Sequence, residues 1–355
     1  MSASHTIIEP KSSPLVERLT STQRTSLTTP DGTFIEIAYR VYQKGSFSTI
    51  YCFALKIGGV FKGRFALKVR MEDKKSPRRS GTIYVLEEHN LLTLITEWSK
   101  EQPFQFEQDS EEYYHYLISN KSHYVAKLHF SMVIDGFRYN IMDFYPESLF
   151  QILNSWERRE IKNREVFIKT VLLDILCGLI DCHEGANFAH RDIKLENILV
   201  FQDHFGRWSA RLTDFGLSAP RVLTIKNNDD RGTIGGTFIY SSPELLANAT
   251  LWVNHDEHST DGEPNPELVT LDLAKADVWA TGIIAWQMVL NDYPFPSDKV
   301  KEVKRMINNI ECLEEQWEKL KTFSPSLYEL VKRMLTSSPD ERPTARMLLG
   351  DPFFQ

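Results

Sequence analysis

The sequence predicts an α+β protein of two lobes, with a strand-rich first third and a helix-rich remainder. β-branched and aromatic residues dominate the runs between Phe34 and Arg70, whereas apolar residues recur at helical spacing after Pro146. The chain has 355 residues with 42% hydrophobic and 25% charged side chains, which suits two sizeable cores. We expect a small antiparallel sheet with one main helix in the first lobe and a larger, mostly helical second lobe.

Composition along the chain sets the expected boundaries. Residues 1–32 are rich in Ser, Thr and Pro and predict a mobile leader. The first lobe is expected over 33–145, with a polar, acidic and aromatic insertion at about 97–122. The second lobe is expected over 146–355, with a polar insertion at about 248–270.

The first lobe shows its strands and one helix in order. Two β-rich runs bend at Lys44–Ser46, and Gly58 and Gly59 mark the turn into a third run. Apolar residues at helical spacing predict a helix over 84–95. The dipeptide Asp135-Gly136 between two further β-like runs predicts a hairpin.

The second lobe is predicted to be helical from its apolar periodicity. Residues 166–183 form one long apolar stretch with side chains at helical spacing, which is typical of a buried helix. The last part of the chain is also mostly helical by the same criterion. The FALK strings at 53–56 and 65–68 are too short to indicate a repeat architecture.

Charge and composition exclude several classes of function. A net charge of −7 argues against general affinity for nucleic acid. The sequence lacks an apolar run long enough for a signal peptide or a membrane span. Its four cysteines have no metal-ligand spacing. We therefore expect a reduced intracellular protein of the cytoplasm, with the nucleus as a second possible location. His255 and His258 lie near several acids, where a solvated loop competes with a metal site.

The strongest chemical signal is a pair of short motifs in a fixed order. HRDIKLEN covers residues 190–197, and DFG begins at Asp214, seventeen residues past Asn197. Phosphoryl transfer needs a carboxylate to accept a hydroxyl proton, and Asp192 fits that role. Lys194 would place its ammonium against the transferred phosphate, and Asn197 and Asp214 are hard oxygen donors of the kind Mg²⁺ prefers.

Through these motifs the chain resembles the eukaryotic protein kinases of the serine/threonine type, and the resemblance covers about residues 33–353. SSPE, DVWATG and ERPTA resemble further motifs of the same family. The resemblance implies a bilobal kinase fold and transfer of the ATP γ-phosphate to serine or threonine of protein substrates, with ATP and Mg²⁺ as cofactors. It also implies that Asn197 and Asp214 hold the metal ions.

The family places a lysine one strand beyond its glycine-rich loop, and two lysines compete for that role. Lys68 lies past the Gly58-Gly59 turn and is preferred, whereas Lys56 reads as a solvated lysine at a strand end. The helical partner of the lysine is assigned to Glu88, because Leu91 and Leu92 would share its face, with Glu87 as the alternative.

The loop that covers the phosphates departs from the family pattern. Of the three glycines in G-x-G-x-x-G, only Gly45 is present, in YQKGSFS. This departure keeps a second reading open, namely a pseudokinase scaffold with weak or no phosphoryl transfer. By resemblance, adenine would meet an apolar slot and a hinge; the residues are Ile50, Ala66, Met142, Leu199 and the hinge Asp143 to Tyr145.

Regulation is expected in the segment between Asp214 and Glu244. The resemblance implies phosphorylation at Thr233, with Ser218 and Thr224 as alternatives, and Arg191 as the partner of the phosphate.

Three further contacts follow from the resemblance. Thr237 would bond Asp192 and Lys194, Asp277 would brace the catalytic loop, and Glu244 would pair with Arg342.

Substrate and partner predictions rest on fewer residues. Glu196 lies where some kinases contact an arginine of the substrate, whereas the second acidic position falls on Leu149, so basic substrates are only slightly favoured. Residues EEYYHYLIS of the first insertion could fold as a helix and dock a partner, although a plain surface insertion is the competing reading. No nucleic acid or membrane is expected as a partner.

Overall fold

The computed structural model describes residues 22–29, 32–44, 48–71, 86–100, 110–158, 161, 163–225, 237–248, 269–297 and 299–355. They form two compact units, so the predicted α+β architecture of two lobes is confirmed. The first unit contains the strands β1 to β6 and the helix α2. The second unit contains the helix α3 and the described residues from Tyr145 onward.

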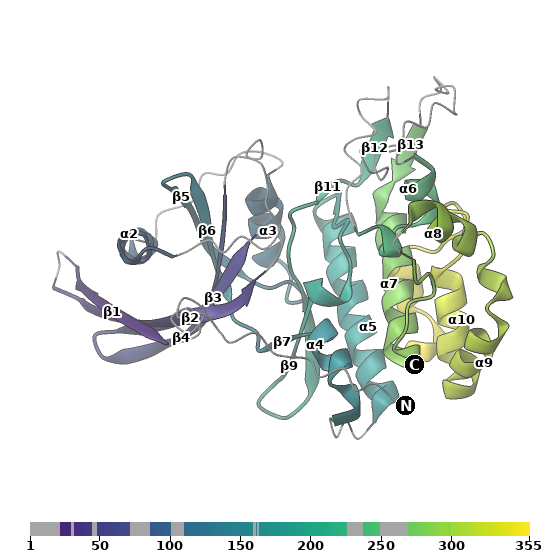
Figure 1. Cartoon of the computed structure of the whole chain (residues 1–355), viewed down its shortest axis with the longest axis horizontal. Coiled ribbons are helices and arrows are strands. Elements are labelled where there is room, and N and C mark those ends of the chain that lie inside the picture. The colour runs from purple at the N-terminus through teal and green to yellow at the C-terminus, as the bar shows by residue number, and fades with distance from the viewer. Residues whose placement is uncertain are drawn as a thin grey trace, which may run out of the picture. The chain divides into compact units, whose positions relative to one another are not determined.

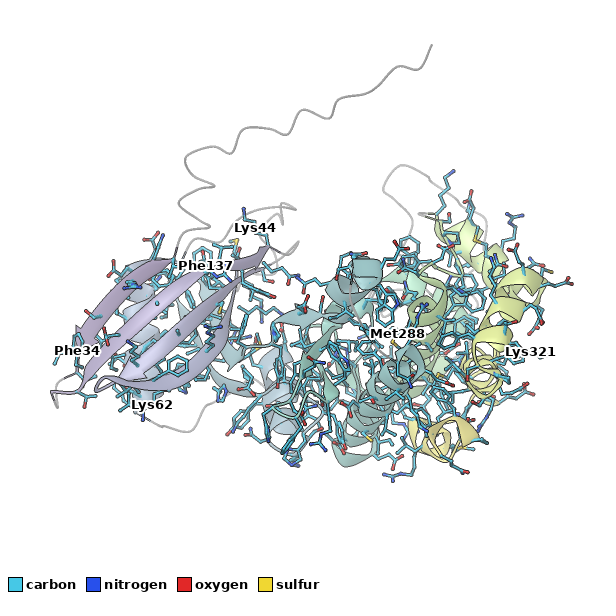
Figure 2. The ribbon with its side chains drawn as sticks, turned by 90° about the horizontal axis from the view of Figure 1, so that it is seen from below. Phe34, Lys44, Lys62, Phe137, Met288 and Lys321 are labelled. Carbon is cyan, nitrogen blue, oxygen red and sulfur yellow. The ribbon has the colours of Figure 1, made fainter. Side chains whose placement is uncertain are left out.

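The first unit is built on one antiparallel sheet of six strands in the order β1-β2-β3-β4-β6-β5, and these strands are labelled in Figure 1. Figure 2 shows Phe34 and Lys62 toward one end of these strands and Lys44 and Phe137 toward the other. The strands are β1 (Gln23–Thr28), β2 (Phe34–Lys44), β3 (Thr49–Ile57), β4 (Val60–Met71), β5 (Leu128–Ile134) and β6 (Phe137–Asp143).

The hairpins of this sheet form where the sequence predicts them. Gly58 and Gly59 both have positive φ angles, 56° and 78°, and connect β3 to β4. Asp135 and Gly136 also have positive φ angles, 50° and 77°, and connect β5 to β6. Asp and Gly tolerate this left-handed backbone better than most residues, which explains why the local signal was sufficient.

Strand β1 corrects the predicted leader. Residues 1–32 were expected to be mobile throughout, but Gln23–Thr28 pair in register with β2, from Gln23 opposite Tyr39 to Thr28 opposite Phe34. Only alternate residues of β1 are partly buried, because it is an edge strand. A polar edge strand has no apolar period, so composition alone assigned it to the leader.

Helix α2 (Glu88–Ser99) covers one face of this sheet. Its residues Leu91 and Leu94 are fully buried in a cluster that also contains Leu67 and Val69 of β4. Because side chains alternate along a strand, Lys68, which lies between those two β4 residues, belongs to the opposite face. The helix was predicted over 84–95 and forms somewhat later in the chain.

The second unit is mostly helical, as predicted. Its helices are α3 (Glu111–Ser119), α4 (Leu149–Asn154), α5 (Arg164–Ile180), α6 (Pro243–Asn248), α7 (Leu273–Leu290), α8 (Val300–Ile307), α9 (Glu314–Phe323), α10 (Pro325–Met334) and α11 (Ala345–Leu349). Its short strands are β7 (Glu147–Ser148), β8 (Phe188–Ala189), β9 (Ile198–Gln202), β10 (Trp208–Leu212), β11 (Ala219–Pro220), β12 (Val222–Ile225) and β13 (Val269–Asp272).

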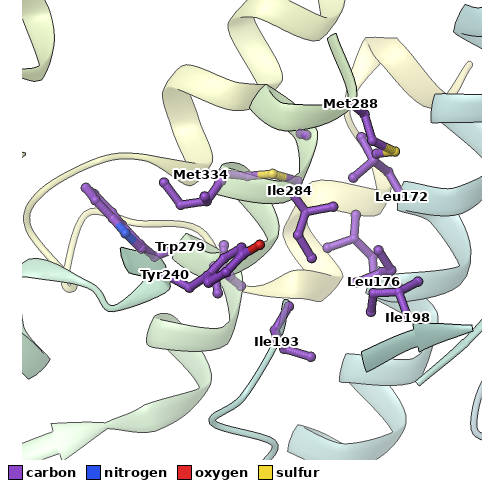
Figure 3. Close-up of a cluster of buried hydrophobic side chains, with 14 of the residues drawn as sticks. Leu172, Leu176, Ile193, Ile198, Tyr240, Trp279, Ile284, Met288 and Met334 are labelled. Carbon is purple, nitrogen blue, oxygen red and sulfur yellow. The ribbon is translucent and has the colours of Figure 1, made fainter. Parts of the chain in front are cut away.

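Two long helices form the centre of this unit. Ten of the seventeen residues of α5 are buried, and sixteen of the eighteen residues of α7 are buried, so α7 is enclosed on nearly every side and α5 on most of its surface. Figure 3 shows Leu172 and Leu176 of α5 and Ile284 and Met288 of α7 in this core, together with Ile193 of the predicted catalytic loop. The core therefore provides a rigid base for that loop.

Helix α3 corrects the predicted insertion at 97–122. The helix EEYYHYLIS forms as the sequence suggested, with Ser110 accepting a hydrogen bond from the Tyr113 N–H at its start. It is not a surface insertion, because Tyr114 and Ile118 are buried in the core of the second unit. The polar and aromatic sequence did not indicate a buried helix, because only a few of its residues face the core.

The second predicted insertion, at about 248–270, lies largely outside the described residues, including His255 and His258. Its described end forms β13, which pairs antiparallel with β12 from Val222 opposite Asp272 to Ile225 opposite Val269.

Candidate functional site

The predicted catalytic loop, His190 to Asn197, is fixed by a buried carboxylate on α7. Asp277 Oδ2 accepts the backbone N–H of His190 at 2.8 Å, and Oδ1 accepts the backbone N–H of Arg191 at 2.8 Å. The ring of His183 also lies 2.8 Å from Oδ2. A carboxylate with only 1% exposure is stable here because these donors replace water. The prediction that Asp277 braces the loop is confirmed.

Asp192 lies within a set of polar contacts. Lys194 Nζ is 2.6 Å from Asp192 Oδ2, and the hydroxyl of Thr237 donates to Oδ1 at 3.2 Å. Lys194 Nζ also donates to Thr237 Oγ1 at 3.2 Å, so the predicted contacts among these three residues are confirmed.

The amide of Asn197 completes the set around Asp192. Its Nδ2 donates to the Asp192 backbone oxygen at 2.8 Å and to the carboxylate at 2.9 Å. The amide is 5% exposed and has one orientation that satisfies both bonds, which leaves its Oδ1 as an acceptor.

The DFG segment begins with a left-handed residue, since Asp214 has a φ angle of 65°. Phe215 is fully buried, and its ring centroid lies 4.7 Å from that of His190 and 4.8 Å from that of His115 on α3. The segment is therefore packed between the catalytic loop and α3, within the second unit. Its backbone conformation costs on the order of 1 kcal/mol or more and persists only because this packing holds it.

Gly216 places two carboxylates close together. A side-chain carbon on Gly216 would lie 3.3 Å from Asp214 Oδ1 and 3.3 Å from Glu111 Oε2. Glu111 is in the first turn of α3, one turn before His115. Glu111 was not among the residues predicted from the sequence. The signal that could have found it is the N-cap Ser110 followed by two glutamates and an apolar face.

Glu88, the predicted partner of Lys68, lies elsewhere. It is exposed in the first turn of α2 and accepts a hydrogen bond from the hydroxyl of Thr25. Helix α2 covers the sheet face that Leu67 lines, whereas Lys68 belongs to the other face. The structure therefore contradicts this assignment, because spacing along the chain could not show which face the helix would cover. Its alternative, Glu87, lies immediately before the same helix.

The predicted adenine residues of the first unit share the face of Lys68. Across the strands, Ile50 lies opposite Lys68, and Met142 lies opposite Ala66. Residues that face each other across strands point to the same side of a sheet, so these four side chains form one surface. Lys68 is 8% exposed. The competing lysine, Lys56, makes an exposed 3.9 Å ion pair with Glu36, as expected of a solvated lysine at a strand end.

The remaining predicted site residues fall in different places. Asp143 ends β6 in the first unit, and the Tyr145 ring lies 5.0 Å from Phe201 in the second. Leu199 is half-buried on β9. Gly45 and Thr233 lie outside the described residues.

The end of the segment that follows DFG, SSPE, is held by a buried ion pair. Arg342 has no exposed surface and donates to both carboxylate oxygens of Glu244, at 2.7 and 3.0 Å. Its guanidinium also lies 5.1 Å from the ring centre of Trp279. The predicted pairing of Glu244 with Arg342 is confirmed, and its bidentate geometry is of the strong kind.

Asn197 and Asp214 were predicted to hold Mg²⁺, and their chemistry fits that ion. Both offer oxygen atoms, and the amide of Asn197 is oriented by its two bonds to Asp192. When bound, Mg²⁺ neutralises phosphate charge. Among the described residues, no group of three or more His, Cys, Asp or Glu is clustered as a metal site of its own. In the same part of the chain, no helix has the length and apolar character needed to cross a bilayer.

A braced aspartate with a lysine and an asparagine beside it, on an α+β fold of two units, is typical of proteins that transfer phosphoryl groups. A sequence model described as "Protein kinase domain" matches residues 95–354. The chain therefore belongs to the protein kinase family.

Several curated proteins are similar to this chain. It is 31% identical over 205 residues to calcium-dependent protein kinase 6 of Plasmodium berghei, covering 58% of this chain and 12% of that protein. It is 33% identical over 181 residues to CBL-interacting protein kinase 25 of Oryza sativa, covering 51% and 29%. A calcium and calcium/calmodulin-dependent serine/threonine-protein kinase of Pisum sativum is 30% identical over 194 residues, covering 54% and 31%. The matched region thus spans less than a third of each relative.

Proposed function

We propose that this chain is an ATP-dependent protein kinase that phosphorylates serine or threonine. The observation that carries the proposal is the set of contacts around Asp192. Lys194 and Asn197 both donate to its Oδ2, and Thr237 donates to its Oδ1. Asp192 would accept the proton of the substrate hydroxyl, and Lys194 would stabilise charge on the transferred phosphate. Two similar proteins, of Saccharomyces cerevisiae and Pisum sativum, are named as serine/threonine-protein kinases, which supports that class.

The residues that would bind the nucleotide are assigned from the sequence motifs and from the chemistry of their side chains. Lys68 on β4 would contact the phosphates, and Asn197 and Asp214 would hold Mg²⁺. Glu111, whose carboxylate lies beside the DFG segment within the second unit, is proposed to act in nucleotide use there.

The test is phosphate transfer from labelled ATP with Mg²⁺ to serine, threonine and tyrosine peptides. Asp192→Asn should lower turnover by about 10² to 10⁴-fold, as expected for loss of a general base. Asp292→Asn, at an exposed aspartate of the same unit, is the matched control and should keep full turnover. Transfer that Asp192→Asn leaves intact would reject the proposal.

The pseudokinase alternative makes a different prediction from the same residues. The poor glycine loop around Gly45 favours it, whereas the intact set of Lys68, Asp192, Asn197 and Asp214 favours activity. Nucleotide binding without transfer, with or without phosphorylation of the chain, would support the scaffold reading.

Activation by phosphorylation at Thr233 is part of the proposal. Arg191 is largely buried beside Asp192 with a φ angle of 70°, and burial lowers the pKa of its guanidinium. A phosphate on the segment would add charge-assisted hydrogen bonds to this cation. If Thr233→Ala keeps full activity and the wild-type chain carries no phosphate there, the activation step is wrong.

We also propose a preference for a basic residue near the target. Glu196 follows the catalytic loop lysine closely, and its Oε2 is buried with no hydrogen-bond partner among the described residues. A buried carboxylate oxygen without a donor is costly, so a cation from a substrate would be favoured there. Glu196→Gln should reduce the benefit of a substrate arginine by about tenfold. An equal loss on peptides with and without the arginine would contradict this.

That the protein acts inside the cell stays a prediction.

A further inference from the structure

The predicted hinge begins at Asp143, whose side chain lies on the sheet face that α2 covers. Asp143 lies opposite Phe65 across β4 and β6, whereas the next pair is Ala66 with Met142. Because side chains alternate, Asp143 and Phe65 point to the face covered by α2, and Met142 points to the face of Lys68. The carboxylate therefore lies on the side away from the predicted nucleotide surface.

The partner of Asp143 is a histidine placed by a break in the register. His129 Nε2 lies 2.6 Å from Asp143 Oδ1, and the two side chains are 20% and 41% exposed. The pairing of β5 with β6 shifts between Leu128 and Phe130, so His129 is the extra residue of a β-bulge. A bulge re-aims a side chain that regular alternation would point elsewhere.

The histidine is held in turn by aromatic rings. Its ring meets Phe65 edge-on with centroids 5.4 Å apart, and lies 5.9 Å from Trp98. Trp98 belongs to the last turn of α2 and itself meets Phe65 edge-on at 5.1 Å. Edge-to-face contacts of this kind fix ring orientation. Contacts thus connect α2 to Asp143, the first residue of the hinge, through the rings of Trp98 and His129.

We propose that His129 is a positioning residue for nucleotide binding: it holds the Asp143 side chain, and through it the hinge backbone, in the orientation that adenine requires. Helix α2 sets that orientation through Trp98, so α2 governs affinity for the nucleotide and not the phosphoryl-transfer step. The inference rests on the proposed function and on the hinge at Asp143 to Tyr145, where the family resemblance places adenine.

The reason for an effect on affinity alone is where the group acts. A change at the hinge would weaken contacts that substrate and transition state share equally, because adenine does not react. Such a loss raises KM for ATP and leaves kcat unchanged. A residue needed only for folding would lower the active fraction and leave KM unchanged.

The experiment measures kcat and KM for ATP in the full chain with His129→Leu and His129→Gln. His129→Leu removes the donor and should raise KM about five- to tenfold, as expected for one hydrogen bond to a charged group. His129→Gln keeps an N–H donor and should recover most of the affinity. His204→Leu is the control, because His204 is an exposed histidine between β9 and β10, takes no part in the proposed contacts and should leave KM unchanged.

A second variant guards against loss of folding. Asp143→Asn keeps size and shape while it removes the charge that His129 meets, and should also raise KM. Wild-type KM in both His129→Leu and Asp143→Asn, or a fall in kcat with KM unchanged, would overturn the inference. If the wild-type chain neither binds nor uses ATP, it is the proposed function that fails.

Discussion

Lys194 holds the Asp192 carboxylate with its ammonium 2.6 Å from Oδ2, and Thr237 bonds both residues from the far end of the segment that follows DFG. The far end of the segment is thereby bonded to the catalytic loop through the Thr237 hydroxyl. Its position is linked to the charge and orientation of the proposed base.

Thr237→Val should lower kcat about tenfold, because the hydroxyl contributes one bond to each of Asp192 and Lys194. Thr237→Ser keeps the hydroxyl and should retain most of the rate. Single-turnover kinetics on a serine peptide separates the two. Equal rates for the Val and Ser variants would show that the hydroxyl does not matter.

Glu111→Gln should lower kcat/KM at least tenfold, because a carboxylate beside the DFG segment is proposed to act in nucleotide use. Glu88→Gln is the matched control on α2, where the side chain is exposed, and its activity should stay near that of the wild-type chain. The reverse ranking of the two variants would restore the assignment made from the sequence.

Asp277→Ala should destabilise the second unit by about 3–5 kcal/mol, since it leaves two backbone donors and His183 without their buried acceptor. Urea unfolding measures the change in free energy. Asp292→Asn should change it by less than about 0.5 kcal/mol, as expected at an exposed site. A loss of less than about 1 kcal/mol in Asp277→Ala would mean that the brace is dispensable.

Arg342→Ala should cost about 3–5 kcal/mol, because it leaves the largely buried Glu244 carboxylate without its cation. The control is Arg207→Ala, which breaks a pair whose arginine is 74% exposed and should cost less than about 1 kcal/mol. Thermal unfolding of the two variants side by side measures the difference. Comparable losses would contradict the role given to burial.

The pair of Arg221 with Asp272 should make stability depend on pH. Partial burial alone would raise the pKa of Asp272, but hydrogen bonds from Arg221, at 2.8 and 3.1 Å, and from the Ala274 N–H hold that pKa below its usual value. A depressed carboxyl pKa stabilises the fold above the unfolded pKa of about 4. That stabilisation is lost as the pH falls through the folded pKa.

The measurement compares the unfolding free energy of the wild-type chain and Asp272→Asn between pH 7 and pH 3. The wild-type chain should be more stable by about 1 kcal/mol at pH 7. The difference should shrink below about pH 4. A difference that is constant across this range would show that the charge of Asp272 plays no part.

Local patterns carried much of the fold. The hairpin at Asp135-Gly136 and the turn at Gly58-Gly59 could be predicted because aspartate and glycine tolerate their backbone angles better than most residues. The apolar content of α5 was visible as a continuous run. Strand β1 was not visible, because an edge strand with few buried side chains has the composition of a leader.

The sequence by itself determined which residues can do the chemistry. HRDIKLEN and DFG place Asp192, Lys194, Asn197 and Asp214 at fixed spacing, and short loops of fixed spacing leave few arrangements. Only the tertiary structure decided which glutamate lies beside DFG and which face α2 covers. Helix packing depends on contacts between residues far apart in the chain, so spacing led to Glu88, whereas it is the helix that carries Glu111 that packs against Phe215.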